Sequence, residues 1–185
     1  GEFIGIIGEN NSGKSTLCQA IVGIVPHFYK GAYGGRILID SQEIANQSIS
    51  DTCRTAGIVF QNPFNQVTGS KLTVYEEIAF GLENLGLTRK EMIKRIDYSL
   101  NLLDIYSYRN RNPFDLSGGQ MQRTLFARLY LQNAELILLD EAQHLKDRGD
   151  TKSQYLIADW LKFLLDDLAL PTVMLGLPRL EELLA

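Results

Sequence analysis

The sequence predicts an α/β fold in which helices flank a mostly parallel sheet. Short apolar runs at residues 2–7, 57–60, 136–139 and 172–175 have the composition of buried strands. Segments with helical spacing of apolar residues separate these runs, and such alternation is typical of parallel sheets covered by helices. A chain of 185 residues that is 45% hydrophobic and 22% charged is long enough for a domain with its own core.

The first third of the chain alternates regular segments with loop-forming residues. A helix is predicted over residues 14–22, and a loop rich in glycine and aromatic residues over 26–35. Residues 36–40 read as a short strand, and residues 51–54 as one helical turn. The buried strand at 57–60 then ends at a Gln-Asn-Pro step.

Capping boxes mark the starts of the next two predicted helices. Thr73 with Glu76 forms the first box and Thr88 with Glu91 the second, and the helices end near residues 85 and 103. Their apolar stripes are expected in the core rather than at a ligand, and consist of Val74, Ile78, Leu82, Leu85, Met92, Ile96, Leu100 and Leu103. Further helices are predicted over residues 117–131, 151–168 and 178–185.

The segment after the first strand matches the phosphate-binding pattern G-x-x-x-x-G-K-S. A glycine-rich loop without a ligand is the alternative, but the strand before it and the helix after it favour a loop whose backbone N–H groups hold a triphosphate. Lys14 would reach the β- and γ-phosphates, and the Ser15 hydroxyl would bind Mg²⁺. Asn11 replaces a common glycine, and asparagine tolerates positive φ. The candidate nucleotide-binding residues are Asn10, Asn11, Ser12, Gly13, Lys14, Ser15 and Thr16.

Polar residues end two other predicted strands. Asp140 and Glu141 follow an apolar strand, where Asp140 would hold Mg²⁺ and Glu141 would act as the general base on water. A solvated acidic pair is the alternative, and the phosphate loop favours the nucleotide site. Gln61 could orient water and contact Mg²⁺, although a glutamine before Asn-Pro is more often a turn residue. These side chains should meet, because ligands in such sheets bind at the carboxyl ends of strands.

A second anion-binding segment lies at residues 116–123, Leu-Ser-Gly-Gly-Gln-Met-Gln-Arg. Its serine and glycines open a helix, and a helix N-terminus is a ready site for an anion. Because the chain already has a phosphate loop, this second segment suggests binding to the γ-phosphate of a nucleotide held by a partner. Its candidate residues are Ser117, Gly118, Gly119 and Gln120.

Taken together, residues 1–141 resemble the nucleotide-binding domain of ABC transporters. The motifs that carry the resemblance are residues 8–16 (the first phosphate motif), Gln61 (the Q-loop), 116–120 (the signature motif) and 137–141 (the second acidic motif). Residues 26–31, Pro-His-Phe-Tyr-Lys-Gly, are similar to the ATPase of energy-coupling-factor vitamin and metal importers.

The resemblance implies a P-loop NTPase fold with a helical insertion that carries the signature motif. Residues 1–185 would form a single ATPase domain, truncated, with a core of 1–70 and 132–185 and a helical subdomain of 71–131. Two such subunits would hold two ATP molecules with Mg²⁺ head to tail and drive a transmembrane transporter subunit, whose coupling helices would face residues 61–81. The protein would be cytoplasmic, peripheral on the inner face of the cell membrane.

The sequence departs from the ABC pattern after Glu141. Residues 142–147 lack the expected Pro-x-Ser-x-Leu-Asp except for Asp147, and no histidine follows His144, so the switch histidine that senses the γ-phosphate is missing. Residues 136–185 instead resemble an AAA+ ATPase of the transposition-helper type, which opens the alternatives of a DNA-stimulated ring, or of a hybrid nucleotide-binding chain with weak turnover. The signature motif argues against the ring.

Composition limits the other possibilities. The net charge of −4 argues against a general nucleic-acid binder, so no nucleic acid is expected unless the AAA+ interpretation holds. Cys18 and Cys53 lack metal-site spacing and are expected to be thiols in a reducing compartment. No apolar run approaches the roughly 18 residues of a membrane span, and no signal peptide is visible. The chain starts at glycine almost within its first strand, which predicts a piece of a longer protein.

Overall fold

A computed structural model describes residues 3–83, 87–142 and 171–177 of the chain. Its main sheet is wholly parallel, with strand order β1-β6-β5-β4, so the predicted fold class is confirmed. The strands are β1 (Phe3–Ile7), β4 (Ala56–Val59), β5 (Leu136–Leu139) and β6 (Thr172–Gly176). Each lies within one or two residues of the run that the sequence predicts.

Side chains along these strands alternate between two separate hydrophobic clusters, because successive residues of a strand point to opposite faces of the sheet. One face contributes Val59, Ile137, Leu139 and Met174 to the larger cluster. The other contributes Ile58, Leu138, Val173 and Leu175 to the smaller cluster. The sheet is therefore buried on both faces, which explains why its strands are continuously apolar.

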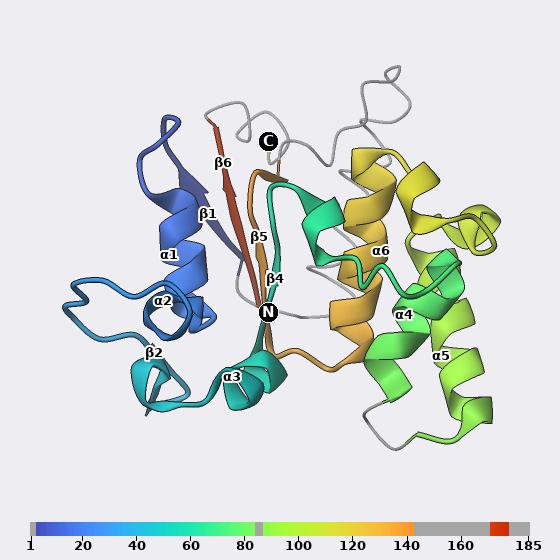
Figure 1. The fold of residues 1–185 in the computed structure, drawn as a ribbon, viewed down its shortest axis with the longest axis horizontal. Helices are drawn as coiled ribbons and strands as arrows, with labels where there is room; N and C mark the ends of the chain where they lie inside the picture. The colour runs from blue at the N-terminus through green and yellow to red at the C-terminus, as the bar shows by residue number, and fades with distance from the viewer. Residues whose placement is uncertain (1–2, 84–86, 143–170, 178–185) are drawn as a thin grey trace.

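The smaller cluster is covered by α1 (Lys14–Ile21), whose Cys18 is fully buried in it. In Figure 1 this helix lies on one side of the sheet, beside the short α2 (Ile24–His27) and above α3 (Ile49–Thr55). The sequence predicted α3 as a single helical turn and missed α2, which contains a proline and interrupts the predicted loop.

A two-stranded antiparallel sheet replaces the strand predicted over residues 36–40. It pairs β2 (Leu38–Ile39) with β3 (Gln42–Glu43), separately from the main sheet. The two residues of the turn, Asp40 and Ser41, have φ of 49° and 65° and reverse the chain at once. The predicted strand is therefore shorter than expected, and its pairing is local.

The larger cluster is built by α4 (Val74–Glu83), α5 (Arg89–Leu102) and α6 (Gly118–Leu131) on the other side of the sheet (Figure 1). Both predicted capping boxes are present: Thr73 with Glu76, and Thr88 with Glu91. Of the predicted apolar stripes, Met92 is only partly buried, Leu85 lies outside the described residues, and the remaining members are buried. No helix in the described part of the chain is both long and apolar enough to span a bilayer.

Short 3₁₀ helices connect these elements. They are η1 (Ile44–Asn46), η2 (Pro63–Gln66), η3 (Tyr106–Tyr108) and η4 (Pro113–Asp115). The helices predicted over residues 151–168 and 178–185 lie outside the described residues, and so do His144 and Asp147.

Candidate functional site

The phosphate-loop segment connects β1 to α1 at the carboxyl edge of the sheet. Gly13 precedes the helix with φ of 92°, a conformation that glycine adopts without a Cβ penalty. Asn11 has φ of 63°, as its tolerance of positive φ predicts. No side chain caps the start of α1, so no side chain competes with an anion for the first backbone N–H groups of this helix.

Lys14 folds back over this loop. Its Nζ donates to the Gly8 and Glu9 carbonyl oxygens, at 2.8 Å each, and the residue is only 7% exposed. A buried ammonium held by two carbonyls at the start of the loop closes the segment around the space where phosphate groups would lie. The structure thus places the Lys14 ammonium beside the loop, and its contact with the β- and γ-phosphates stays a prediction.

Asp140 lies directly after β5, and its backbone N–H donates to the Val59 carbonyl at the end of β4 (2.9 Å). Its side chain is 3% exposed, and burial raises the pKa of the carboxyl group, as does the charge of Glu141. A hydrogen bond from Ser15 acts in the opposite direction on that pKa. The Oδ1 atom is buried without a hydrogen-bond partner.

These two residues fit Mg²⁺. A buried carboxylate oxygen without a partner, next to a serine hydroxyl, offers the hard oxygen ligands that Mg²⁺ prefers. Bound cation would also offset the desolvation that now raises the Asp140 pKa. Ser15 and Asp140 therefore meet as the sequence predicts for a metal site.

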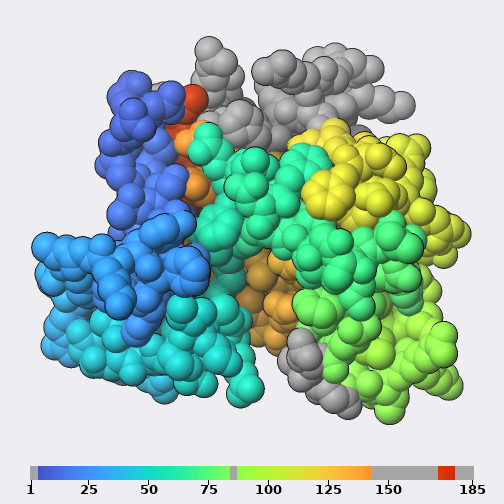
Figure 2. All heavy atoms as spheres, viewed as in Figure 1, coloured from blue at the N-terminus to red at the C-terminus, as the bar shows by residue number. Residues whose placement is uncertain are grey.

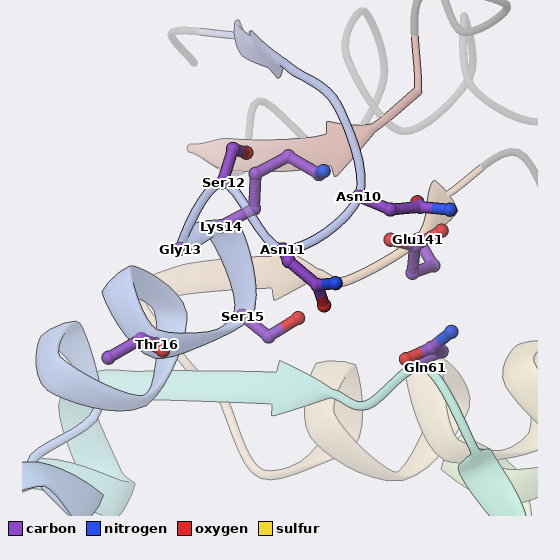
Figure 3. Close-up of a pocket in the computed structure, with 9 residues that line it drawn as sticks. All are labelled: Asn10, Asn11, Ser12, Gly13, Lys14, Ser15, Thr16, Gln61 and Glu141. Carbon is purple, nitrogen blue, oxygen red and sulfur yellow. The ribbon is translucent and has the colours of Figure 1, made fainter.

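Glu141 and Gln61 complete the cavity. A hollow of about 520 Å³ is lined by the phosphate loop, Gln61 and Glu141, and Figure 3 shows their side chains around the same space. Glu141 has φ of 56°, a left-handed conformation that costs a non-glycine residue roughly 1–2 kcal/mol. Such strain is found where the surrounding structure fixes a side chain for function. The loop residues that line the cavity are Asn10, Asn11, Ser12, Gly13, Lys14, Ser15 and Thr16.

The predicted signature residues lie at the start of α6 and do not line this cavity. Ser117 and Gln120 form a capping box: the Gln120 N–H donates to Ser117 Oγ (3.3 Å), and the Ser117 N–H donates to Gln120 Oε1 (3.1 Å). Ser117 and Gly118 are exposed. The helix end is therefore accessible from outside the subunit, while Gly119 packs inward.

Comparison with known families decides the class of protein. The family model described as ABC transporter matches residues 1–144. The chain belongs to the ABC transporter family. The ATP-binding domain that the motifs predict is thereby confirmed, while the likeness of residues 136–185 to AAA+ ATPases falls mostly outside the described residues and stays a prediction.

Curated ABC relatives are similar over the same part of the chain. Identity is 41% over 141 residues with a putative ABC transporter ATP-binding protein of Pyrococcus horikoshii, covering 76% of this chain and 49% of the relative. It is 40% over 147 residues with the energy-coupling factor transporter ATP-binding protein EcfA1 of Streptococcus thermophilus, covering 80% and 51%. The chain thus spans about half the length of these relatives.

Solved ABC structures share the fold. CbiO1 from Clostridium perfringens, described as part of the ABC transporter complex cbiONQ, gives a TM-score of 0.77 at 29% identity and covers 95% of this chain and 66% of its own. An ATP-binding cassette described in a dimeric post-hydrolysis state with ADP and phosphate also gives a TM-score of 0.77, at 26% identity. This match covers 95% of this chain and 74% of the cassette chain.

The end of β6 touches the phosphate loop of this ABC domain. The Gly8 N–H donates to the Gly176 carbonyl (3.2 Å), and Leu177 follows where the resemblance places the switch histidine. The strand that would carry this sensor is therefore in position, but its next residue has no titratable or hydrogen-bonding side chain.

Sequence reasoning missed a partly buried group of charged and polar side chains close to the segment that follows Gln61. Gln66, Glu77 and Arg128 are joined by hydrogen bonds and an ion pair between segments far apart in the chain. The only sequence signal was an acidic residue on the otherwise apolar face of α4, where Glu77 is fully buried.

Proposed function

We propose that this chain is the ATP-binding part of an energy-coupling-factor-like importer, hydrolysing Mg²⁺-ATP at a head-to-tail dimer interface to drive transport. The observation that carries the proposal is the cavity at the carboxyl edge of the parallel sheet, where the phosphate loop, Gln61 and Glu141 surround one space. The likeness to the energy-coupling factor transporter ATP-binding protein EcfA1 supports the transporter class.

Each residue of the cavity has a role in this proposal. The loop N–H groups and Lys14 hold the β- and γ-phosphates. Gln61 orients a water molecule, and Glu141 accepts a proton from it as the water oxygen bonds to the γ-phosphorus. The bond from that phosphorus to the β–γ bridging oxygen breaks, and ADP and phosphate leave. Ser15, Gln61 and Asp140 would hold Mg²⁺, which when bound neutralises phosphate charge.

A second subunit completes the site in this proposal. The exposed start of α6, with Ser117 and Gly118 at the surface, can contact a γ-phosphate that lies in the partner's cavity. Ser117, Gly118, Gly119 and Gln120 are then the partner-facing residues. The dimeric state described for the cassette with ADP and phosphate supports this arrangement.

A transmembrane subunit would dock in the groove between the two layers of the domain. Figure 2 shows a hollow between α3 and α4, and α6 contributes to its floor. This groove of about 380 Å³ has a mainly apolar lining, which includes Phe60, Phe80 and the exposed Cys53. A coupling helix with an apolar face fits such a lining, to which residues 61–81 contribute Gln66, Phe80 and Gly81.

The domain would divide as the motifs suggest. We assign residues 1–70 and 132–185 to the core and 71–131 to a helical subdomain, with the whole unit at the inner face of the cell membrane. The packing of α4, α5 and α6 into a single cluster supports the helical subdomain.

The test uses purified protein and two helix caps of the same kind. Ser117→Arg should abolish turnover while binding of a fluorescent ATP analogue persists, because its phosphate loop is intact. Thr88→Arg removes the equivalent capping box of α5, at a similar cost of about 1 kcal/mol, and should leave turnover unchanged. If Ser117→Arg hydrolyses ATP as fast as Thr88→Arg and the wild type, the signature motif has no role in the mechanism.

Slow turnover is the second candidate, and the absent histidine after β6 favours it. This candidate predicts that the chain binds ATP but hydrolyses it weakly, whereas an ATP-dependent dimer of Glu141→Gln on sizing would support the ABC-type ATPase itself. Fast cooperative hydrolysis by the wild-type chain would reject this second candidate. Oligomers larger than dimers that require ATP and respond to DNA would instead support the AAA+ alternative.

A further inference from the structure

The segment that follows Gln61 is fastened to the edge of the sheet by a side chain. Gln66 Nε2 donates to the Ile58 carbonyl (2.8 Å), and Gln66 Oε1 accepts from the Phe60 N–H (2.9 Å). In the described sheet β4 is an end strand. The amide of Gln66 therefore binds β4 through the same groups that a neighbouring strand would use.

A partly buried ion pair holds the other end of this segment. Arg128 Nη1 donates to Glu77 Oε1 (2.8 Å) and to the Gln66 carbonyl (3.2 Å). The Thr68 N–H and hydroxyl donate to the Glu77 carboxylate, with the hydroxyl at 2.8 Å. Glu77 is fully buried, and its side chain joins α4, α6 and the segment of residues 61–68 (hereafter the Gln61 segment).

Close backbone packing fixes α6 against its neighbours around this ion pair. A Cβ at Gly57 would lie 2.7 Å from Leu129 Cδ2, and one at Gly81 would lie 2.6 Å from Gln132 Nε2. Helix α6 is thus in close contact with β4 through Leu129 and with α4 through Arg128. The arginine that reaches the Gln61 segment therefore projects from a helix that packs directly on both the sheet and α4.

Stability alone gives a weak reason for a charge pair in this position. Replacing a buried ion pair by apolar residues of similar volume is often neutral or stabilising, since desolvation offsets the Coulomb attraction. Charged hydrogen bonds are, however, directional. The pair is therefore better suited to fixing where the Gln61 segment lies than to adding stability.

We propose that Arg128 and Glu77 are positioning residues that hold the Gln61 segment so that Gln61 faces the phosphate-loop cavity. The catalytic part of this inference rests on the proposed function, in which Gln61 orients water. Neither residue lines that cavity, so both act through the backbone of residues 61–68. The same helix begins at Ser117, so the segment is held by the helix that carries the signature motif.

The test compares Arg128→Met with Arg128→Lys and with the exposed control Arg95→Met in the full chain. Amide hydrogen exchange of Phe60 and Thr68 should accelerate about tenfold or more in Arg128→Met, because local opening costs less, while exchange in β5 stays unchanged. In turnover, kcat should fall about 10- to 100-fold with KM nearly constant, because a misplacement near 1 Å has this effect on a reacting group. Arg128→Lys keeps the positive charge, so it should recover part of the exchange protection at Phe60 and Thr68 and part of kcat.

Several results would overturn the inference. If exchange at Phe60 and Thr68 is unchanged in Arg128→Met, the ion pair does not position the Gln61 segment. If exchange in β5 accelerates equally, the ion pair has only a general structural role. If the wild type turns over ATP normally and Arg128→Met has an unchanged kcat, the ion pair has no part in positioning Gln61 for catalysis. If Arg128→Met does not fold, Glu77→Gln gives the same two readouts. Should the wild type fail to hydrolyse ATP, the proposed function fails, while exchange at Phe60 and Thr68 still decides the positioning.

Discussion

Replacing Asp140 with asparagine should make the nucleotide-free protein more stable and its metal site weaker. The Asp140 carboxylate is 3% exposed, and its Oδ1 lacks a partner. An unsatisfied buried polar atom costs about 1–3 kcal/mol, and more when the group is charged. Removing the charge should therefore raise the free energy of unfolding by at least about 1 kcal/mol at pH 7, or the melting temperature by about 2–4 °C.

The increase in the free energy of unfolding of Asp140→Asn should be larger at neutral pH than at acidic pH. Burial raises the Asp140 pKa above its ordinary value of 3.8, so the folded state binds this proton more tightly than the unfolded state does. The contribution of Asp140 to the free energy of unfolding is therefore highest below pH 3.8. It falls as the pH rises through the raised pKa that Asp140 has in the folded state. The free energy of unfolding of Asp140→Asn should consequently exceed that of the wild type at pH 7, and the difference between the two should shrink toward pH 4.

Urea unfolding between pH 4 and pH 8, with and without Mg²⁺-ATP, measures both effects. A ligand at about 100 times its Kd stabilises a protein by about 2.7 kcal/mol, and the variant should lose most of this increment. Glu135→Gln makes the same charge change at an exposed position and should stay within about 0.5 kcal/mol of the wild type. A nucleotide-free variant less stable than the wild type at pH 7, or one with the full Mg²⁺-ATP increment, would refute the reasoning.

Two further predictions concern packing and thiols. Gly57→Ala should destabilise by about 1–3 kcal/mol, because its Cβ would lie 2.7 Å from Leu129, whereas Gly34→Ala meets nothing within 4 Å and should be neutral in the same denaturant titration. Burial, with the nearby Asp140 charge, raises the Cys18 pKa far above its ordinary range, so a maleimide at pH 8 should label the exposed Cys53 and leave Cys18 unmodified until the protein is unfolded. Equal labelling of both thiols in the native protein would contradict the placement of α1.

The elements of this fold were predictable because their signals are local. Continuous apolar runs, the capping boxes at Thr73 and Thr88, and the Gly-Lys-Ser step at the start of α1 each depend on residues within one turn or strand. Helix α2 and the β2–β3 turn were missed, because a proline inside a helix and residues at positive φ contradict the local signals that prediction uses.

Sequence alone was enough to predict a nucleotide site in this ABC domain, since the phosphate loop and the Asp-Glu step are recognisable from consecutive residues. Only the tertiary structure decided which groups meet. Parallel pairing of β4 with β5 brings Gln61 and Glu141 to one edge of the sheet. Arg128 and Glu77, 51 residues apart, form an ion pair only because α4 packs on α6. No spacing rule predicts such a pair, because it depends on burial between two helices and not on the period of either.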